Sequence, residues 1–234
     1  MKAGYTHISM LLDRSGSMSH KVSDVIGGFN SLVEKQKVEP GTCTLSAVQF
    51  DTVDRYEVIH DFLDLQEVPE LTKSVYFSRG GTPLVDALAQ LIISTGTSLS
   101  ALPEKDRPEK VIVVIFTDGQ ENSSVEYKKA DVTKLIKQQE EKYNWDFMFM
   151  GADLASVGEA QALGLANVIQ YVNTSKGTGG TYAYASRALS ARRLAPADER
   201  LQIGSVCLNE DGSVKSSTPP PPPTMTTTNT NKGS

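Results

Sequence analysis

Residues 7–17 read HISMLLDRSGS, and this stretch decides the fold. Its first six residues are a short, mostly apolar run, which predicts a buried β-strand. Small and polar residues then take over from Asp13 to Ser17, and apolar residues recur at helical spacing from Val22 to Val33. The D-x-S-G-S run therefore lies where a strand ends and a helix begins. In an open α/β sheet, ligands bind at this end of the strands.

The side chains of the D-x-S-G-S run offer only hard oxygen ligands. Asp13 supplies a carboxylate, Ser15 and Ser17 supply hydroxyl groups, and Gly16 permits a tight turn between them. Sites made of oxygen alone suit Mg²⁺, Ca²⁺ or Mn²⁺. The five residues by themselves are equally compatible with an ordinary strand-to-helix loop in which a serine caps the helix.

Two later stretches add residues of the same chemical kind. RGGTPL, residues 79–84, combines a glycine turn with Thr82, which we expect to cap a helix that begins at Pro83. VIVVIFTDG, residues 111–119, is a continuous apolar run of the kind found in a central parallel strand, and it ends at Asp118.

With these three parts in this order, the chain resembles the von Willebrand factor type A (vWA) domain family. That family carries a metal-ion-dependent adhesion site (MIDAS) composed of a D-x-S-x-S run, a separate threonine and the aspartate of a T-D-G run. The resemblance implies that Ser15, Ser17 and Thr82 hold one Mg²⁺, and that Asp13 and Asp118 ligate it directly or through water. Mn²⁺ and Ca²⁺ are the alternative ions.

The resemblance extends over residues 5 to about 194 as a plan of alternating strands and helices. It implies an α/β, Rossmann-like fold: a doubly wound, mostly parallel six-stranded sheet with one antiparallel edge strand and helices on both faces. The strands are expected at residues 6–12, 43–50, 55–62, 111–117, 146–151 and 168–171. The helices are expected at about residues 20–37, 83–95, 131–143, 154–163 and 178–194. The second and third strands are too close for a helical crossover, so they should pair antiparallel.

Composition divides the chain into three parts. Residues 1–195 are expected to form the vWA domain. Residues 196–216 include the hairpin-turn signal NEDG, and they either add two short strands or remain loose. Residues 217–234 pass from five consecutive prolines into Thr and Asn repeats with almost no apolar side chains, which predicts a disordered tail.

Charge and composition limit the classes of partner. The 234 residues have a net charge of −5 and a pI of about 5.3, so neither nucleic acid nor an anionic membrane is expected as a partner. No apolar run reaches the roughly 20 residues of a transmembrane helix, and residues 1–7 lack the apolar core of a signal peptide. We therefore expect a cytoplasmic protein, and association with a phage particle or virion stays open. Two cysteines do not make a disulfide framework.

The resemblance implies a binding function. Mg²⁺ keeps water where the protein supplies few ligands, and in vWA domains a Glu or Asp of a protein partner commonly fills that position. We expect no catalytic residue and no organic cofactor, because Ser15 and Ser17 lack the G-x-S-x-G context of a nucleophile. Two alternatives are a metal-assisted hydrolase or phosphotransferase, and a purely structural module whose metal only ties loops together.

Three further features carry weaker signals. Asp51 and Asp153 also end strands on the side of the predicted site, where they either support the ligands or cap loops. The glycine-rich residues 176–181 lack the G-K-[ST] ending of a P-loop and do not fit the G-x-G-x-x-G motif. They therefore predict the entry of a helix.

Overall fold

The computed structural model describes residues 1–218, and residues 219–234, which hold most of the predicted tail, lie outside the described part. Eight strands form one sheet in the order β3-β2-β1-β4-β5-β6-β7-β8. The strands are β1 (Lys2–Asp13), β2 (Thr42–Phe50), β3 (Glu57–Asp64), β4 (Pro108–Thr117), β5 (Asp146–Gly151), β6 (Val168–Gln170), β7 (Ser205–Leu208) and β8 (Val214–Thr218). The edge strands β3 and β8 pair antiparallel with their neighbours, and all other pairs are parallel.

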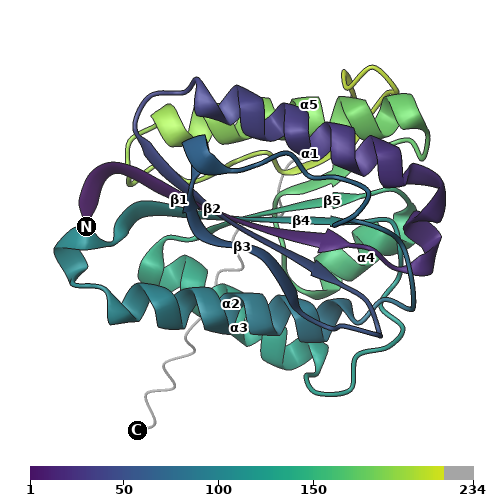
Figure 1. The fold of residues 1–234 in the computed structure, drawn as a ribbon, viewed down its shortest axis with the longest axis horizontal. Coiled ribbons are helices and arrows are strands. Elements are labelled where there is room, and N and C mark those ends of the chain that lie inside the picture. The colour runs from purple at the N-terminus through teal and green to yellow at the C-terminus, as the bar shows by residue number, and fades with distance from the viewer. Residues whose placement is uncertain (219–234) are drawn as a thin grey trace, which may run out of the picture.

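Helices cover both faces of the sheet, which confirms the doubly wound α/β class (Figure 1). They are α1 (Val22–Lys37), α2 (Leu84–Ala101), α3 (Lys129–Tyr143), α4 (Leu154–Ala162) and α5 (Ser175–Leu194), with short 3-10 helices η1 (Gly16–Lys21), η2 (Leu65–Glu67) and η3 (Glu104–Asp106). Side chains of α1 and α5 share one core cluster, and side chains of α2, α3 and α4 share the other. Strand β4 is apolar from Val111 to Phe116, because Ile112 and Val114 face the first cluster while Val113 and Ile115 face the second.

The sheet has eight strands with two antiparallel edges, rather than the six strands with one antiparallel edge that we expected. Strands β7 and β8 come from the C-terminal extension, so the hairpin is the alternative that forms, and β8 continues to Thr218, past the predicted start of the tail at residue 217. Val206 and Leu208 are buried against the α1–α5 layer. The hairpin thus covers an edge that β6 would otherwise leave unpaired.

Helix α2 differs from its prediction at both ends. It begins at Leu84 and ends at Ala101, six residues later than expected, because Leu99 is still buried in the core. Pro83 holds the N-cap position, so the expectation that Thr82 caps this helix is wrong. By length and composition α2 is able to span a membrane, but 56% of it is buried inside the domain, as in the core helix of a sheet layer.

The glycine-rich stretch lies inside α5 rather than before it, since the helix begins at Ser175. A Cβ atom on Gly180 would come within 2.6 Å of the backbone nitrogen of Gly212, in the turn between β7 and β8. Glycine at this position therefore lets the terminal hairpin pack closely on the helix.

Candidate functional site

The five predicted ligands meet at the carboxyl edge of the parallel strands. Asp13 is the last residue of β1, Asp118 follows β4, and Thr82 precedes α2. Asp13, Ser15, Thr82 and Asp118 are buried, whereas Ser17 is exposed. The structure thus gathers side chains from three separate loops into a site that opens to solvent at Ser17.

Short hydrogen bonds join these side chains. The Ser17 hydroxyl donates to Oδ1 of Asp118 over 2.7 Å, and its oxygen is 3.0 Å from Oγ of Ser15. The backbone N–H of Ser15 donates to Oδ1 of Asp13 over 2.7 Å. Hydroxyl and carboxylate oxygens therefore line the site, and its backbone turns fix where they point.

Gly119 leaves a small space among these oxygens. A Cβ atom built on Gly119 would lie 3.0 Å from Oγ1 of Thr82, 3.2 Å from Oγ of Ser17 and 3.5 Å from Oδ2 of Asp13. Oxygens from all three loops therefore converge on one point that a larger residue would fill.

Two carboxyl groups share this buried site, and the environment of Asp13 shows the electrostatic cost. Burial raises the pKa of Asp13 from 3.8 to about 6, against the effect of hydrogen bonds from the Thr117 hydroxyl, at 2.6 Å, and from Ser15, while the charge of Asp118 adds to the rise. A bound cation favours the ionised form of a nearby carboxyl group. A cation bound beside Asp13 would therefore stabilise the ionised form of this buried carboxyl group.

Lys21 is a site residue that the sequence analysis missed. Its Nζ atom lies 2.9 Å from Oδ2 of Asp118, and the side chain is only 2% exposed. Nζ also lies 3.3 Å from the Tyr171 hydroxyl group. The sequence signal was weak because a lysine at the start of a helix ordinarily faces solvent.

Asp51 holds two of the site loops together. Its Oδ2 atom accepts from Nε of Arg14 at 2.6 Å and from Nε of Arg79 at 2.7 Å. Burial opposes its ionisation, but hydrogen bonds from Arg79 and from the backbone of Asp54 and Val53 hold the pKa of Asp51 below its usual value. Asp51 thus connects the D-x-S-G-S loop to the RGGT loop that carries Thr82.

The backbones of these two loops are also paired. The N–H of Arg79 donates to the carbonyl of Arg14 over 2.8 Å, and the N–H of Gly16 donates to the carbonyl of Gly80 over 2.9 Å. Asp153, in contrast, accepts from the N–H of Ser156 and caps α4. Of the two uncertain aspartates, Asp51 supports the site and Asp153 is a helix cap.

The loop after β4 caps α2 from outside the helix. Glu121 accepts from the N–H of Val85, and the Ser124 hydroxyl accepts from the N–H of Asp86. The N–H of Thr82 donates to Oδ1 of Asn122 over 2.9 Å. This loop satisfies the first turn of the helix, so the Thr82 hydroxyl is free for the site.

The donor set is dominated by hydroxyl groups. Within residues 1–218, no three His, Cys, Asp or Glu side chains gather in a way that could hold a metal ion. Serine and threonine oxygens with a few carboxylates fit a hard divalent cation better than a softer one.

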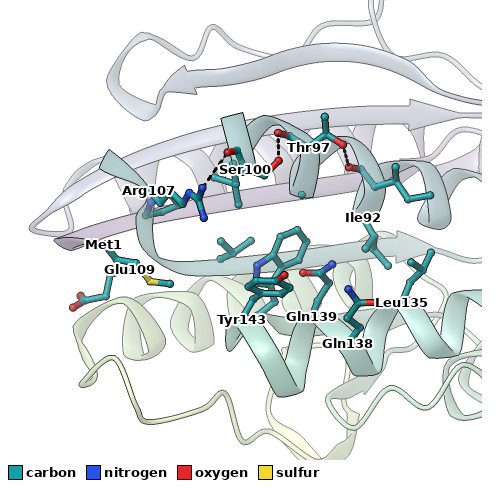
Figure 2. A pocket seen from close by; sticks show the side chains of 16 residues that line it. Met1, Ile92, Thr97, Ser100, Arg107, Glu109, Leu135, Gln138, Gln139 and Tyr143 are labelled. Carbon is teal, nitrogen blue, oxygen red and sulfur yellow. Dashed lines mark hydrogen bonds between the residues drawn. The ribbon is translucent and has the colours of Figure 1, made fainter. Parts of the chain in front are cut away.

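A separate pocket of about 280 Å³ lies between α2 and α3 (Figure 2). Ile92, Leu135, Tyr143 and Trp145 contribute apolar surface to its wall, and Gln139 adds an amide group. None of the five site residues lines it.

A family model for the von Willebrand factor type A domain matches residues 7–181, well over half of the chain, so this protein belongs to the vWA family. A search of curated proteins found no match.

Several solved structures resemble the chain at low sequence identity. Proximal thread matrix protein 1 from the mussel byssus, in a form with a zinc-occupied MIDAS motif, superposes with a TM-score of 0.55 and 14% identity over 80% of this chain and 46% of that chain. Crystal form 2 of the same protein gives a TM-score of 0.54 with the same identity and coverage. A von Willebrand factor type A structure from Catenulispora acidiphila gives 0.49 at 15% identity, over 81% of this chain and 43% of that chain. The chain therefore spans less than half the length of these proteins, and at such identity the mussel structures bear on the fold alone.

Proposed function

We propose that this domain is a divalent-metal-dependent protein-binding module that uses a Mg²⁺-bearing MIDAS to grip a Glu or Asp side chain of a partner. Asp13, Ser15, Ser17, Thr82 and Asp118 would hold the ion, and Mn²⁺ or Ca²⁺ would be able to replace it. The observation that carries this proposal is the convergence of oxygens from three loops on the space beside Gly119.

The chemistry of the donor set supports a binding role. Two carboxylates balance the charge of a divalent ion, and neutral hydroxyl groups supply the remaining protein ligands. When bound, the ion would offer a coordination position to an anionic oxygen, since Mg²⁺ readily retains exchangeable water. The domain's own residues would orient the ion, while Ser17 leaves the site open toward solvent.

The surroundings of the site support a non-catalytic role. Burial lowers the pKa of His7 to about 3, and its ring lies within the sheet, 2.9 Å from Thr44 and 3.0 Å from Ser9. His20 is exposed and contacts Asn173. Neither ring is hydrogen-bonded to a proposed ligand, so neither is placed as a general base for hydrolysis.

Thr82 provides the test of this function because it does not cap α2. Thr82→Ala should stay folded and lose partners that depend on metal, whereas Thr82→Ser keeps a hydroxyl group and should retain them. The measurement compares partner capture from the native host in Mg²⁺ and in EDTA for the wild type and both variants. Retention of every chelator-sensitive partner by Thr82→Ala would overturn the metal-bridge mechanism and favour the structural-module alternative.

A further inference from the structure

Lys21 places a fixed positive charge at the proposed metal site. It is the last residue of η1, and Met18, in the same short helix, is fully buried in the core. Anchoring η1 in this way turns Lys21 back toward β4, where its Nζ lies 2.9 Å from Oδ2 of Asp118. The position of this charge is therefore built into the fold and does not depend on a mobile surface side chain.

Lys21 forms its ion pair with a single carboxylate. Its only ion pair within residues 1–218 is with Asp118, whose other oxygen, Oδ1, accepts from the Ser17 hydroxyl. Tyr171 also contacts Lys21, with its hydroxyl 3.3 Å from Nζ and its ring centroid 5.2 Å away. A buried ammonium group needs such pairing, so Lys21 and Asp118 neutralise one another.

We propose that Lys21 is a counter-cation of the metal site, which stabilises the site without metal and weakens the affinity for the ion. This inference rests on the proposed function. Without metal, Lys21 neutralises one of the two buried carboxylates. With a divalent ion bound, the site holds one positive charge more than its carboxylates balance.

The excess positive charge makes the metal-bound site prefer protein partners that supply an anionic oxygen. An anionic oxygen completes the charge balance when it takes the open coordination position, whereas a neutral oxygen does not. Lys21 would therefore favour a carboxylate of the partner over a backbone carbonyl or a hydroxyl group, at the expense of metal affinity.

Lys21→Met tests this role because it removes the charge and keeps much of the buried side chain. Mn²⁺ is the probe, and its affinity is measured by titration alongside melting curves in EDTA and in saturating Mn²⁺. We expect Lys21→Met to melt lower than the wild type in EDTA and to bind Mn²⁺ at least tenfold more tightly. Its stabilisation by Mn²⁺ should exceed that of the wild type by about 3–6 °C.

Lys21→Arg is the matched control, since it keeps the positive charge, and its Mn²⁺ affinity should stay within about threefold of the wild type. Tyr171→Phe is a milder variant that keeps the ring and removes the hydroxyl contact to Nζ, and it should shift the Mn²⁺ affinity in the same direction as Lys21→Met. If Lys21→Met does not fold even in Mn²⁺, the Tyr171→Phe result decides the question.

The competing explanation is that Lys21 only braces η1 against β4. In that case Lys21→Met lowers the melting temperature equally with and without Mn²⁺, and Mn²⁺ affinity is unchanged or weaker, which overturns the proposal. A wild-type protein that binds no Mn²⁺ contradicts the proposed function itself. A wild type that binds Mn²⁺ as tightly as Lys21→Met contradicts only the role of Lys21.

Discussion

Two buried aspartates, at opposite ends of the sheet, are each held between two arginines. Asp51, after β2 at the carboxyl edge, contacts Arg14 and Arg79 at 2.6 and 2.7 Å. Asp146, at the start of β5 and thus at the amino edge, contacts Arg192 and Arg200 at 2.6 and 2.9 Å. An aspartate between two arginines therefore appears twice in one domain, and in the first cluster Glu57 also pairs with Arg14.

The two clusters connect different segments. The Asp51 cluster joins the two loops that carry Asp13 and Thr82, whereas the Asp146 cluster fastens the end of α5 and the segment leading to β7, with the N–H of Leu201 donating to Oδ1 of Asp146. The comparison teaches that a buried ion cluster by itself does not mark a functional site. The carboxyl edge of the sheet differs from the amino edge because its ion cluster positions the hydroxyl and carboxylate oxygens of the proposed metal site.

Removing either aspartate should cause the largest loss of stability. Asp146→Ala leaves the buried Arg192 without its ion pair, which costs about 3–5 kcal/mol of unfolding free energy. Asp51→Ala should cost less, because the buried Arg14 keeps its ion pair with Glu57. Only Asp51→Ala should also weaken Mn²⁺ binding, by tenfold or more. Urea unfolding and Mn²⁺ titration check both effects, and an equal loss of Mn²⁺ affinity in Asp146→Ala would refute the distinction between the two clusters.

Filling the space at Gly119 should abolish the response to metal. The Cβ of Gly119→Ala would occupy the point on which the oxygens of Thr82, Ser17 and Asp13 converge. Wild type should gain about 2.7 kcal/mol when Mn²⁺ is present at a hundredfold excess over its dissociation constant, and Gly119→Ala should gain none. The two proteins are compared by melting in EDTA and in Mn²⁺; a full metal response in Gly119→Ala would place the ion elsewhere.

The buried carboxyl of Asp13 should make the metal-free protein less stable as the pH rises. Because burial raises its pKa from 3.8 to about 6, the folded state holds this proton more tightly than the unfolded chain. The stability that Asp13 contributes is fully present below about pH 3.8 and is lost as the pH rises through 6, with a size of about 3 kcal/mol.

Asp13→Asn separates this effect from other titrations, since the variant does not titrate at this position and groups away from the site, including buried His7, contribute equally to both proteins. In EDTA, the stability of Asp13→Asn relative to the wild type should increase between pH 4.5 and pH 7. Urea midpoints at the two pH values provide the measurement. A constant difference between the two proteins would show that the pKa of Asp13 is not raised.

Gly96→Ala, in α2 near the amino edge, should produce the smallest change. The nearest atom to its added Cβ is Nε2 of Gln139 at 3.9 Å, an ordinary contact. Replacing glycine within a helix should therefore stabilise the domain by about 0.5–1 kcal/mol and leave the Mn²⁺ response intact. If Gly96→Ala also lost the response to Mn²⁺, the effect of Gly119→Ala would be explained by altered packing of the domain and not by a filled metal site.

The residues that were predictable from the sequence are those whose signals are local. The D-x-S-G-S and T-D-G runs lie directly after apolar strands, so Asp13, Ser15, Ser17 and Asp118 were identifiable together with β1 and β4. The structure places them as expected, and their role as metal ligands remains a prediction.

The features that escaped prediction depend on contacts between distant segments. The cap of α2 comes from Glu121 and Ser124 in another loop, so a local pattern assigned it wrongly to Thr82. Lys21 and Asp51 gain their roles only when η1, β2 and the RGGT loop meet. The NEDG signal left open whether strands form after residue 195, because β7 and β8 are only four and five residues long and β7 is held by its pairing with β6.

The most direct test of the central claim is an equilibrium titration of the wild type and Asp13→Ala with Mg²⁺ and with Mn²⁺. If the carboxyl edge is a divalent metal site, the wild type binds one ion per chain and melts at a higher temperature with the ion than in EDTA, while Asp13→Ala shows neither effect. Identical melting curves for the wild type with metal and with EDTA, together with no detectable ion binding, would contradict the account.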